Sequence, residues 1–286
     1  MEGRATMKGG IAKVAGKRRI LSREEITRHV NIKRRDEILA AVQSVLNSAP
    51  ADHVQVNVFE QIADAQNWKF VPGERQTAYE SDVFALTELP RKYNDKALIV
   101  DRPTPILIHA SSRITLPAGT YRLSLQSLNA ARLYLDEQLV AETPFLKVAG
   151  NGHNPVYQLG PPRPDRVSLP AAHTEQVVSF HSDGGSVVVS LLALTAHQGR
   201  PIELGEIVVA VAKDGEPYRL LGPNVNESDQ DAADAYGRFD DEGWLTFLQR
   251  DAERRHEWEQ QQRAELGKAE REYWQRRHAW TRIFVA

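Results

Sequence analysis

The amino-acid sequence predicts a mainly β protein with flanking helices: an antiparallel β-sandwich over residues 105–222, N-terminal helices before it and a long C-terminal helix after it. The sandwich is indicated by short runs of alternating apolar and polar residues from Pro105 onward, separated by turns rich in Gly, Pro and Asp. The C-terminal helix is indicated by a run of good helix formers that contains no proline after Asp240.

The chain before Pro105 divides into three predicted segments. Residues 1–20 are rich in Gly, Lys and Arg without periodicity, which predicts a disordered basic leader. Residues 21–50 are expected to be helical, because Ser22 and Glu25 have the spacing of a capping box and helical spacing follows for Ile26, Val30, Ile38, Leu39, Val42, Val45 and Leu46. Residues 51–104 give mixed signals and are expected to form an ordered connector, in which VQVNVFEQI fits strand or helix.

Six runs carry the strand pattern: 106–108, 113–116, 121–126, 131–136, 176–181 and 186–194. Asp183-Gly184 stands between two of them and predicts a hairpin, because glycine adopts a positive φ without a Cβ clash. A second pair, Asp214-Gly215, follows the run IVVAVAK.

A further turn is expected at Asp136, with Glu137 and Gln138. Leu133 and Leu135 precede it and should face the core of the sandwich.

The last two segments are an acidic linker over residues 223–239 and the long helix over residues 240–286. The apolar stripe of this helix is thin and interrupted: Trp244, Leu248, Ala252, Leu266, Ala269, Tyr273 and Trp280. Its many glutamates lie at spacings suited to i, i+4 ion pairs. This pattern favours a solvated helix with one docked edge over a nucleic-acid-binding helix, so nucleic acid is not expected as a partner.

Composition excludes several classes of site. The chain has 286 residues and no cysteine, so disulfides, thiolate zinc sites and thiol nucleophiles are all absent. The net charge of −2 favours no particular partner. No run is apolar and long enough to span a membrane, and no signal peptide is expected because the basic N-terminal residues lack an apolar segment. The localisation therefore stays unknown.

The stretch GTYRLSLQSLNAARLYLD, Gly119 to Asp136, resembles the protective-antigen type β-sandwich domain, a lectin-like module of bacterial toxins, glycosidases and adhesins. The later stretch SLPAAHTEQVVSFHSDGGSVVVSLLAL is similar to a second signature of that family. The resemblance covers about residues 105–195 and implies a sandwich that binds carbohydrate in an exported setting. Where sugar-binding members have consecutive aspartates for calcium, this chain has Leu128 and Asn129, and Leu128 offers no side-chain oxygen. Calcium is therefore disfavoured and no other cofactor is expected.

A narrower resemblance rests on NAARLYLDEQLVAETPF, GHNPV, GEIVVAVAKDGEPYRLLGP and REYWQRRHAW. Together these segments are similar to one segment of large exported, cytochrome-c-linked proteins of planctomycete-type bacteria. The cysteines that attach haem in that family are absent here, so no redox chemistry is implied.

Four residues are the predicted ligand-binding candidates: Asn129, Asp136, Asn154 and Tyr157. Asp136 aligns with an aspartate of the family's second strand, and Asn154 and Tyr157 lie in the Gly- and Pro-rich loop 151–164, where a rigid sandwich concentrates its binding residues. The alternative for this loop is a connector between sheets.

No metal or catalytic site is expected. The histidines of the β region have no metal-ligand spacing: His109, His153, His173, His181 and His197. The sequence contains no GxSxG, P-loop or GxGxxG motif, and its carboxylates lie beside turns, so an enzyme is not expected.

The predicted function is a non-catalytic module that binds carbohydrate or a cell-surface protein ligand. The alternative is a structural or assembly protein whose C-terminal helix mediates homo-oligomerisation or docks a partner.

Overall fold

The computed structural model describes residues 11–14, 17–20, 49–60, 75–128, 130–144, 164–169, 173–195, 207–223 and 237–283. The chain forms two compact units, Met1–Ser48 and Ala49–Ala286. In the described part of the first unit, β1 (Ile11–Val14) and β2 (Lys17–Ile20) pair antiparallel. These strands fall within the segment expected to be disordered, and the β-branched Ile11, Val14 and Ile20 favour the extended backbone there. The predicted N-terminal helices lie outside the described residues except for Ala49 and Pro50.

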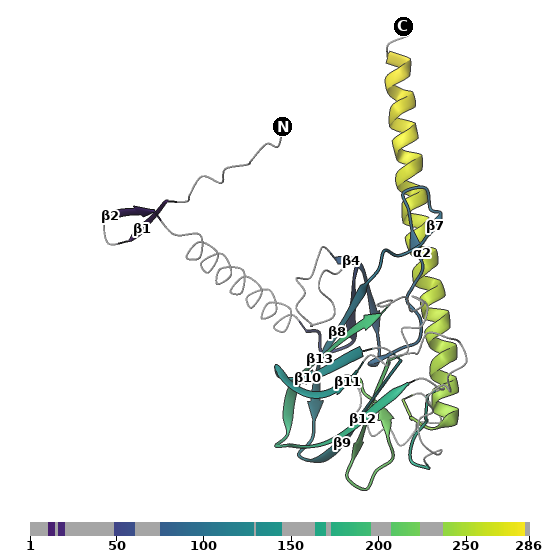
Figure 1. Ribbon diagram of the computed structural model, residues 1–286. Helices are drawn as coiled ribbons and strands as arrows, with labels where there is room; N and C mark the ends of the chain where they lie inside the picture. The colour runs from purple at the N-terminus through teal and green to yellow at the C-terminus, as the bar shows by residue number, and fades with distance from the viewer. Residues whose placement is uncertain are drawn as a thin grey trace, which may run out of the picture. The chain divides into compact units, whose positions relative to one another are not determined.

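Two antiparallel sheets form the sandwich of the second unit (Figure 1), which confirms the predicted fold class. The first sheet has six strands, in spatial order β11 (Gln138–Thr143), β10 (Ala130–Leu135), β13 (Gly185–Thr195), β8 (Ile106–Leu116), β3 (Val54–Glu60) and β4 (Arg75–Ser81). The second sheet contains β12 (Thr174–Ser182), β9 (Gly119–Ser127), β14 (Ile207–Lys213) and β15 (Arg219–Leu220), and β5 (Ala85–Leu86) also pairs with β14. A separate pair is formed by β6 (Lys92–Tyr93) and β7 (Ile99–Val100).

The sandwich begins earlier in the chain than residue 105. The segment 51–104, expected to be a connector, supplies β3 to β7, and β3 lies between β8 and β4 in the first sheet. The alternation in VQVNVFE explains the strand, because Val54, Val56 and Val58 all point into the core and are fully buried. A seven-residue run is too short for its period to distinguish a strand from a helix, so the sequence left both open.

The core between the sheets is built from alternate residues of facing strands. Leu133 is fully buried there, and Leu135 packs against the same core, as predicted for the β10–β11 hairpin. The turn of that hairpin holds Asp136 at φ 44° and Glu137 at φ 73°, both in the left-handed region. Such a turn matches the twist of a two-residue hairpin.

The predicted hairpin at Asp183-Gly184 is wrong. β12, which precedes this turn, pairs with β9 in the second sheet, whereas β13, which follows it, pairs with β8 and β10 in the first sheet. The turn therefore carries the chain from one sheet to the other, and the positive φ of Gly184 serves this crossing instead of a hairpin. At Asp214-Gly215 the flanking strands do pair, with Ala210 opposite Leu220, so that turn is a hairpin as expected.

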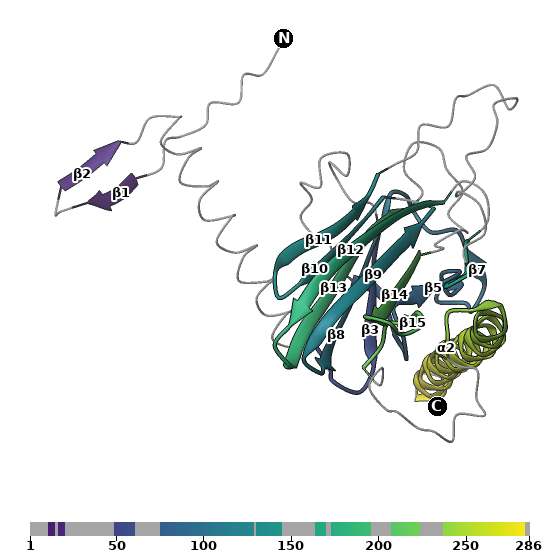
Figure 2. The same cartoon turned by 90° about the horizontal axis from the view of Figure 1, so that it is seen from below.

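Strand β14 is buried on both faces, and this double burial explains where the long helix lies. Val209 and Val211 face the core between the sheets, whereas Val208 and Ala210 face a second core on the outer side. The helix α2 (Asp241–Ile283) covers this outer side through Phe247, together with Trp244 and Leu248. Figure 2 shows α2 beside β5, β14 and β15 and away from β10 and β11.

A polar cap fixes the start of α2. The Asp240 carboxylate accepts a hydrogen bond from the Gly243 N–H at 2.9 Å, which satisfies one of the free donors of the first turn. Burial alone would raise the pKa of Asp240, but this hydrogen bond and the Arg238 guanidinium hold the pKa below its ordinary value.

The described side chains of α2 beyond Trp258 are mostly exposed, and Tyr273 is 57% exposed. The homo-oligomer expected under the alternative function stays a prediction. Within the described residues, no helix combines the length and the apolar character needed to cross a lipid bilayer.

Gly222 permits a close contact between two segments that support the helix. A Cβ at this position would lie 2.3 Å from the Asp82 carbonyl oxygen, and the adjacent Leu221 accepts a backbone hydrogen bond from Phe84. We expect Gly222→Ala to lower the free energy of unfolding by about 1–3 kcal/mol, because the backbone must move to relieve the clash. Urea unfolding measures the change, and Gly267→Ala, at a half-buried position of α2 with room for a Cβ, is the control, where no loss is expected. An unchanged stability of Gly222→Ala would show that the two segments separate at no cost.

His109 of β8 is buried, and its Nε2 lies 3.0 Å from the Ser190 Oγ of β13. Burial lowers the pKa of His109 to about 4, below its ordinary value of 6.5. Between these two pH values the unfolded chain binds a proton that the folded chain does not, so stability falls as the pH falls from 6.5 toward 4. We expect His109→Gln to remove about 3 kcal/mol of this fall.

The measurement compares unfolding free energies at the two pH values within each variant, so any constant loss from the substitution cancels. His181→Gln, at an exposed position, is the control and should keep the wild-type pH dependence. An equal pH dependence in wild type and His109→Gln would contradict the assignment to His109.

Candidate functional site

A cavity of about 480 Å³ lies between the edge of the first sheet and α2. This volume is within the range of small-molecule sites, roughly 300–1,000 Å³. Because β4 is the edge strand, side chains from both of its faces reach the cavity. The lining side chains used below are Gln55, Tyr79 and Glu80 from the sheet, and Asp251, Arg254, Arg255, Glu257, Trp258 and Gln261 from α2, with Pro90 beside them.

Three contacts fix α2 over the segment that follows β4. The Thr87 hydroxyl donates to the buried Asp251 carboxylate at 2.7 Å, and the Arg254 guanidinium binds Asp82 at 2.6 Å. One helical turn further on, the Arg91 N–H donates to the Glu259 carboxylate at 2.8 Å. These contacts fix the position of α2 along the sandwich and so place Trp258 against the edge strand.

The Tyr79 hydroxyl is a polar group buried in the sandwich wall of the cavity. This oxygen is buried and has no hydrogen-bond partner among the described residues. Burial raises the pKa of Tyr79 well above its ordinary value, and the charge of Asp251 adds to this rise, so the hydroxyl stays protonated. A buried hydroxyl without a partner costs free energy, and a ligand group that enters the wall far enough to bond to it recovers that cost.

Trp258 supplies the aromatic surface of the cavity. Its ring lies 6.2 Å from the ring of Tyr79, at an interplanar angle of 60°, and packs against the core between the sheets. Glu257 and Gln261 lie one helical turn apart at the exposed rim of the cavity. Neither side chain has a hydrogen-bond or ion-pair partner in the described part of the chain, so both are available to a ligand.

The Asp251 carboxylate is occupied by contacts within the protein. Burial raises the pKa of this carboxyl, although the hydrogen bond from Thr87 and the charge of Arg255 act in the opposite direction. The Arg255 Nε lies 3.2 Å from the Asp251 carboxylate, and the other end of the guanidinium binds Glu88. Asp251 therefore joins the helix to the sandwich and is not free for general acid or base catalysis.

Of the four predicted ligand-binding residues the structure describes Asp136, which does not line this cavity. Asn129, Asn154 and Tyr157 lie outside the described residues. The Asp136 carboxylate is exposed and accepts a hydrogen bond from the Val188 N–H at 2.8 Å, while its own N–H donates to the Val188 carbonyl at 2.9 Å. Asp136 thus joins the hairpin turn to β13.

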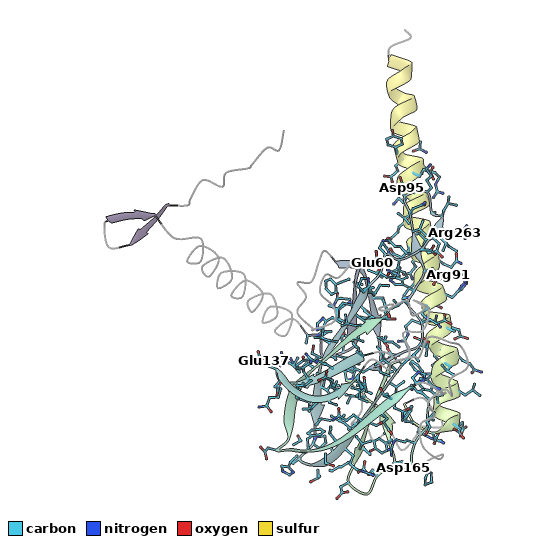
Figure 3. All side chains as sticks on the ribbon, in the orientation of Figure 1. Glu60, Arg91, Asp95, Glu137, Asp165 and Arg263 are labelled. Atoms are coloured by element: carbon cyan, nitrogen blue, oxygen red, sulfur yellow. The ribbon has the colours of Figure 1, made fainter. Side chains whose placement is uncertain are left out.

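Figure 3 shows Glu137, the neighbour of Asp136, on the side of the sandwich away from α2, whereas Glu60 and Arg91 lie on the side toward α2. No group of three or more His, Asp or Glu side chains within the described ranges is arranged to hold a metal ion.

Sequence reasoning did not identify Tyr79 or Trp258 as site residues. Tyr79 lies in the expected connector, and Trp258 lies in a helix expected to be solvated along most of its length. One signal was available: Trp244, Asp251 and Trp258 recur every seven residues and so share one helix face. A carboxylate between two tryptophans on one face indicates that this face packs on a surface with both apolar and polar groups.

The sequence matches no protein-family model and no curated protein. Among solved structures, the PA14 sugar-binding domain of an RTX adhesin matches with a TM-score of 0.39 at 10% identity, over 60% of this chain and 96% of that one. The PA14 domain of the antifreeze protein MpAFP matches with a TM-score of 0.40 at 11% identity, over 61% of this chain and 88% of that one. The A domain of epithelial adhesin 9 from Candida glabrata, in complex with Galβ1-4GlcNAc, matches with a TM-score of 0.31 at 9% identity, over 61% and 91%. At TM-scores this low, these likenesses identify neither a family nor a ligand for this chain.

Proposed function

We propose that this chain is a non-catalytic binding module that takes a sugar ring into the cavity between β4 and α2. The observation that carries the proposal is the buried, unpartnered Tyr79 hydroxyl in a cavity that also presents the ring of Trp258. A sugar ring has an apolar C–H face and a rim of hydroxyls. The aromatic surface suits the face, and convergent polar groups suit the rim.

The hydrogen-bonding groups of the cavity suit neutral hydroxyls. Glu257 accepts only, Gln261 both donates and accepts, and the protonated Tyr79 hydroxyl can do either. A hydroxyl on a sugar also donates and accepts, so each of these groups can be satisfied by a vicinal pair of hydroxyls. The ligand then restores the hydrogen bond that Tyr79 lacks.

The arrangement favours binding over hydrolysis. Glycoside hydrolysis requires two carboxyl groups on opposite sides of the scissile bond, one of them acting as an acid. In this cavity Asp251 is occupied by Thr87 and Arg255, and Glu80 and Glu257 are both exposed to solvent. A binding role needs no such pair.

A glycan array on the full chain, followed by calorimetric titration of the best glycan, tests the proposal. We expect Tyr79→Phe, which removes only the hydroxyl, to weaken binding by about 3- to 10-fold. Tyr134→Phe on β10 is the matched control and should bind as wild type, since Tyr134 does not line the cavity. Circular dichroism establishes that each variant is folded.

Two outcomes would overturn the proposal: binding of no glycan, or unchanged affinity in Tyr79→Phe. In the second case, loss of binding in Asn129→Ala or Tyr157→Ala would move the ligand to the rim predicted from the sequence. The titration is run with calcium and with a chelator, and equal affinities are expected because the polar groups of the proposed site act without a metal.

A further inference from the structure

The charges around the cavity are unbalanced. This imbalance indicates which class of sugar the cavity selects, an inference that rests on the proposed function. Three carboxylates line the cavity, from Glu80, Asp251 and Glu257, against two guanidinium groups, from Arg254 and Arg255. Among the described residues, Glu80 has one ion-pair contact, with the His53 Nε2 at 3.7 Å.

Both arginines are already neutralised by carboxylates outside the cavity lining. Arg254 binds Asp82 at 2.6 Å, and Arg255 binds Glu88 as well as Asp251. A negatively charged ligand would have to compete with these carboxylates for the guanidinium groups. Each guanidinium group of the cavity therefore already has a carboxylate partner within the protein.

The ion pairs behind Pro90 do not reverse this balance. Arg102 donates to the Pro90 carbonyl at 2.7 Å and to Glu60 at 2.8 Å, and Lys92 binds the same Glu60 at 2.5 Å. This group adds one net positive charge. The carboxylates at and beside the cavity exceed the two guanidinium groups by three, since they come from Glu80, Asp82, Glu88, Asp251 and Glu257.

An anionic rim beside an aromatic wall is the combination that recognises an organic cation. The free Glu257 carboxylate at the rim offers an ion pair to an ammonium group, and the ring of Trp258 in the same cavity lining is a surface on which cations are attracted. The unpartnered Tyr79 hydroxyl and the free Gln261 amide remain for neutral hydroxyls.

We infer that the cavity selects an amine-bearing sugar, whose ammonium group lies against Glu257 and Trp258 while its hydroxyls bond to Tyr79 and Gln261. Acidic sugars are excluded by the same carboxylates. The N-acetylated form of the same sugar loses the ion pair and keeps the other contacts.

The test titrates the full chain with glucosamine oligomers and with N-acetylglucosamine oligomers of equal length, at a slightly acidic pH where the free amine is protonated. We expect the glucosamine oligomer to bind about tenfold more tightly and to lose this advantage at high ionic strength. Glu257→Gln should reduce the advantage to near onefold. Glu253→Gln, one turn earlier and outside the cavity lining, is the control that should preserve it.

The outcomes separate the inference from the function on which it rests. Equal binding of both oligomers by wild type would overturn the amine preference and leave a sugar-binding module. A preference that persists in Glu257→Gln would overturn its assignment to this cavity. Binding of neither oligomer, together with an empty glycan array, would overturn both proposals.

Discussion

Glu60→Gln is expected to lower the free energy of unfolding by about 3–5 kcal/mol. The Glu60 carboxylate and the Arg102 guanidinium are both almost fully buried, with side chains 4% and 5% exposed, and lie 2.8 Å apart. The substitution keeps the volume of the side chain but leaves the Arg102 charge in the interior without a carboxylate. Its remaining contacts, the Thr77 hydroxyl at 3.0 Å and the Pro90 carbonyl, are neutral and do not compensate the charge.

Chemical denaturation of wild type and variant measures this loss. Glu142→Gln is the matched control, because the Arg132–Glu142 pair is partly exposed and such pairs contribute about 0–1 kcal/mol. Equal losses in the two variants would contradict the account, since burial would then not decide the strength of the pair. A large loss at Glu60 alone would show that this pair holds the segment around Pro90 against β3.

Phe247→Ala is expected to lower the free energy of unfolding by about 3–5 kcal/mol, because it leaves a large cavity under α2. Phe247 is fully buried against β14 and β15, and its ring stacks on that of Trp244 with centroids 5.1 Å apart. The same contacts hold α2 in the place where Trp258 closes the cavity. Sugar affinity should therefore fall together with stability.

Leu245→Ala is the control for the helix. Leu245 lies two residues away but is 57% exposed, so its loss should change stability by no more than about 0.5 kcal/mol. Thermal or urea unfolding of both variants gives the comparison. A Phe247→Ala variant as stable as Leu245→Ala would mean that α2 is not docked on the second sheet.

The sequence predicted the sandwich where local pattern and tertiary environment agree. Runs such as SVVVSLLAL are apolar, β-branched and bounded by turns, so strand propensity and burial act in the same direction. The chain reversal at Asp183-Gly184 was also correctly located. Which strand pairs with which is decided by side chains distant in sequence, so the same turn could join strands of one sheet or of two.

The cavity could not be predicted from the local sequence pattern for a related reason. Tyr79 and Trp258 are 179 positions apart in the numbering, and only the docking of α2 on the edge of β4 brings their rings within 6.2 Å. Asp136 was predicted as a site residue from its alignment with an aspartate of the resembled family. The structure shows its carboxylate accepting a hydrogen bond from the Val188 N–H, a local contact that the alignment does not reveal, and a role of Asp136 in binding stays a prediction.

The central claim is that a sugar binds between β4 and α2, and the indole N–H signals of the tryptophans test it most directly. The chain has five tryptophans, and ¹H–¹⁵N spectra with Trp258→Phe and Trp244→Phe assign the two that matter. During titration with the best glycan from the array, the Trp258 indole signal should shift saturably with the calorimetric affinity. The signal of Trp244, which packs on Phe239 and Phe247 and does not line the cavity, should stay in place. Saturable glycan binding with an unmoved Trp258 signal would contradict the claim and place the ligand elsewhere on the chain.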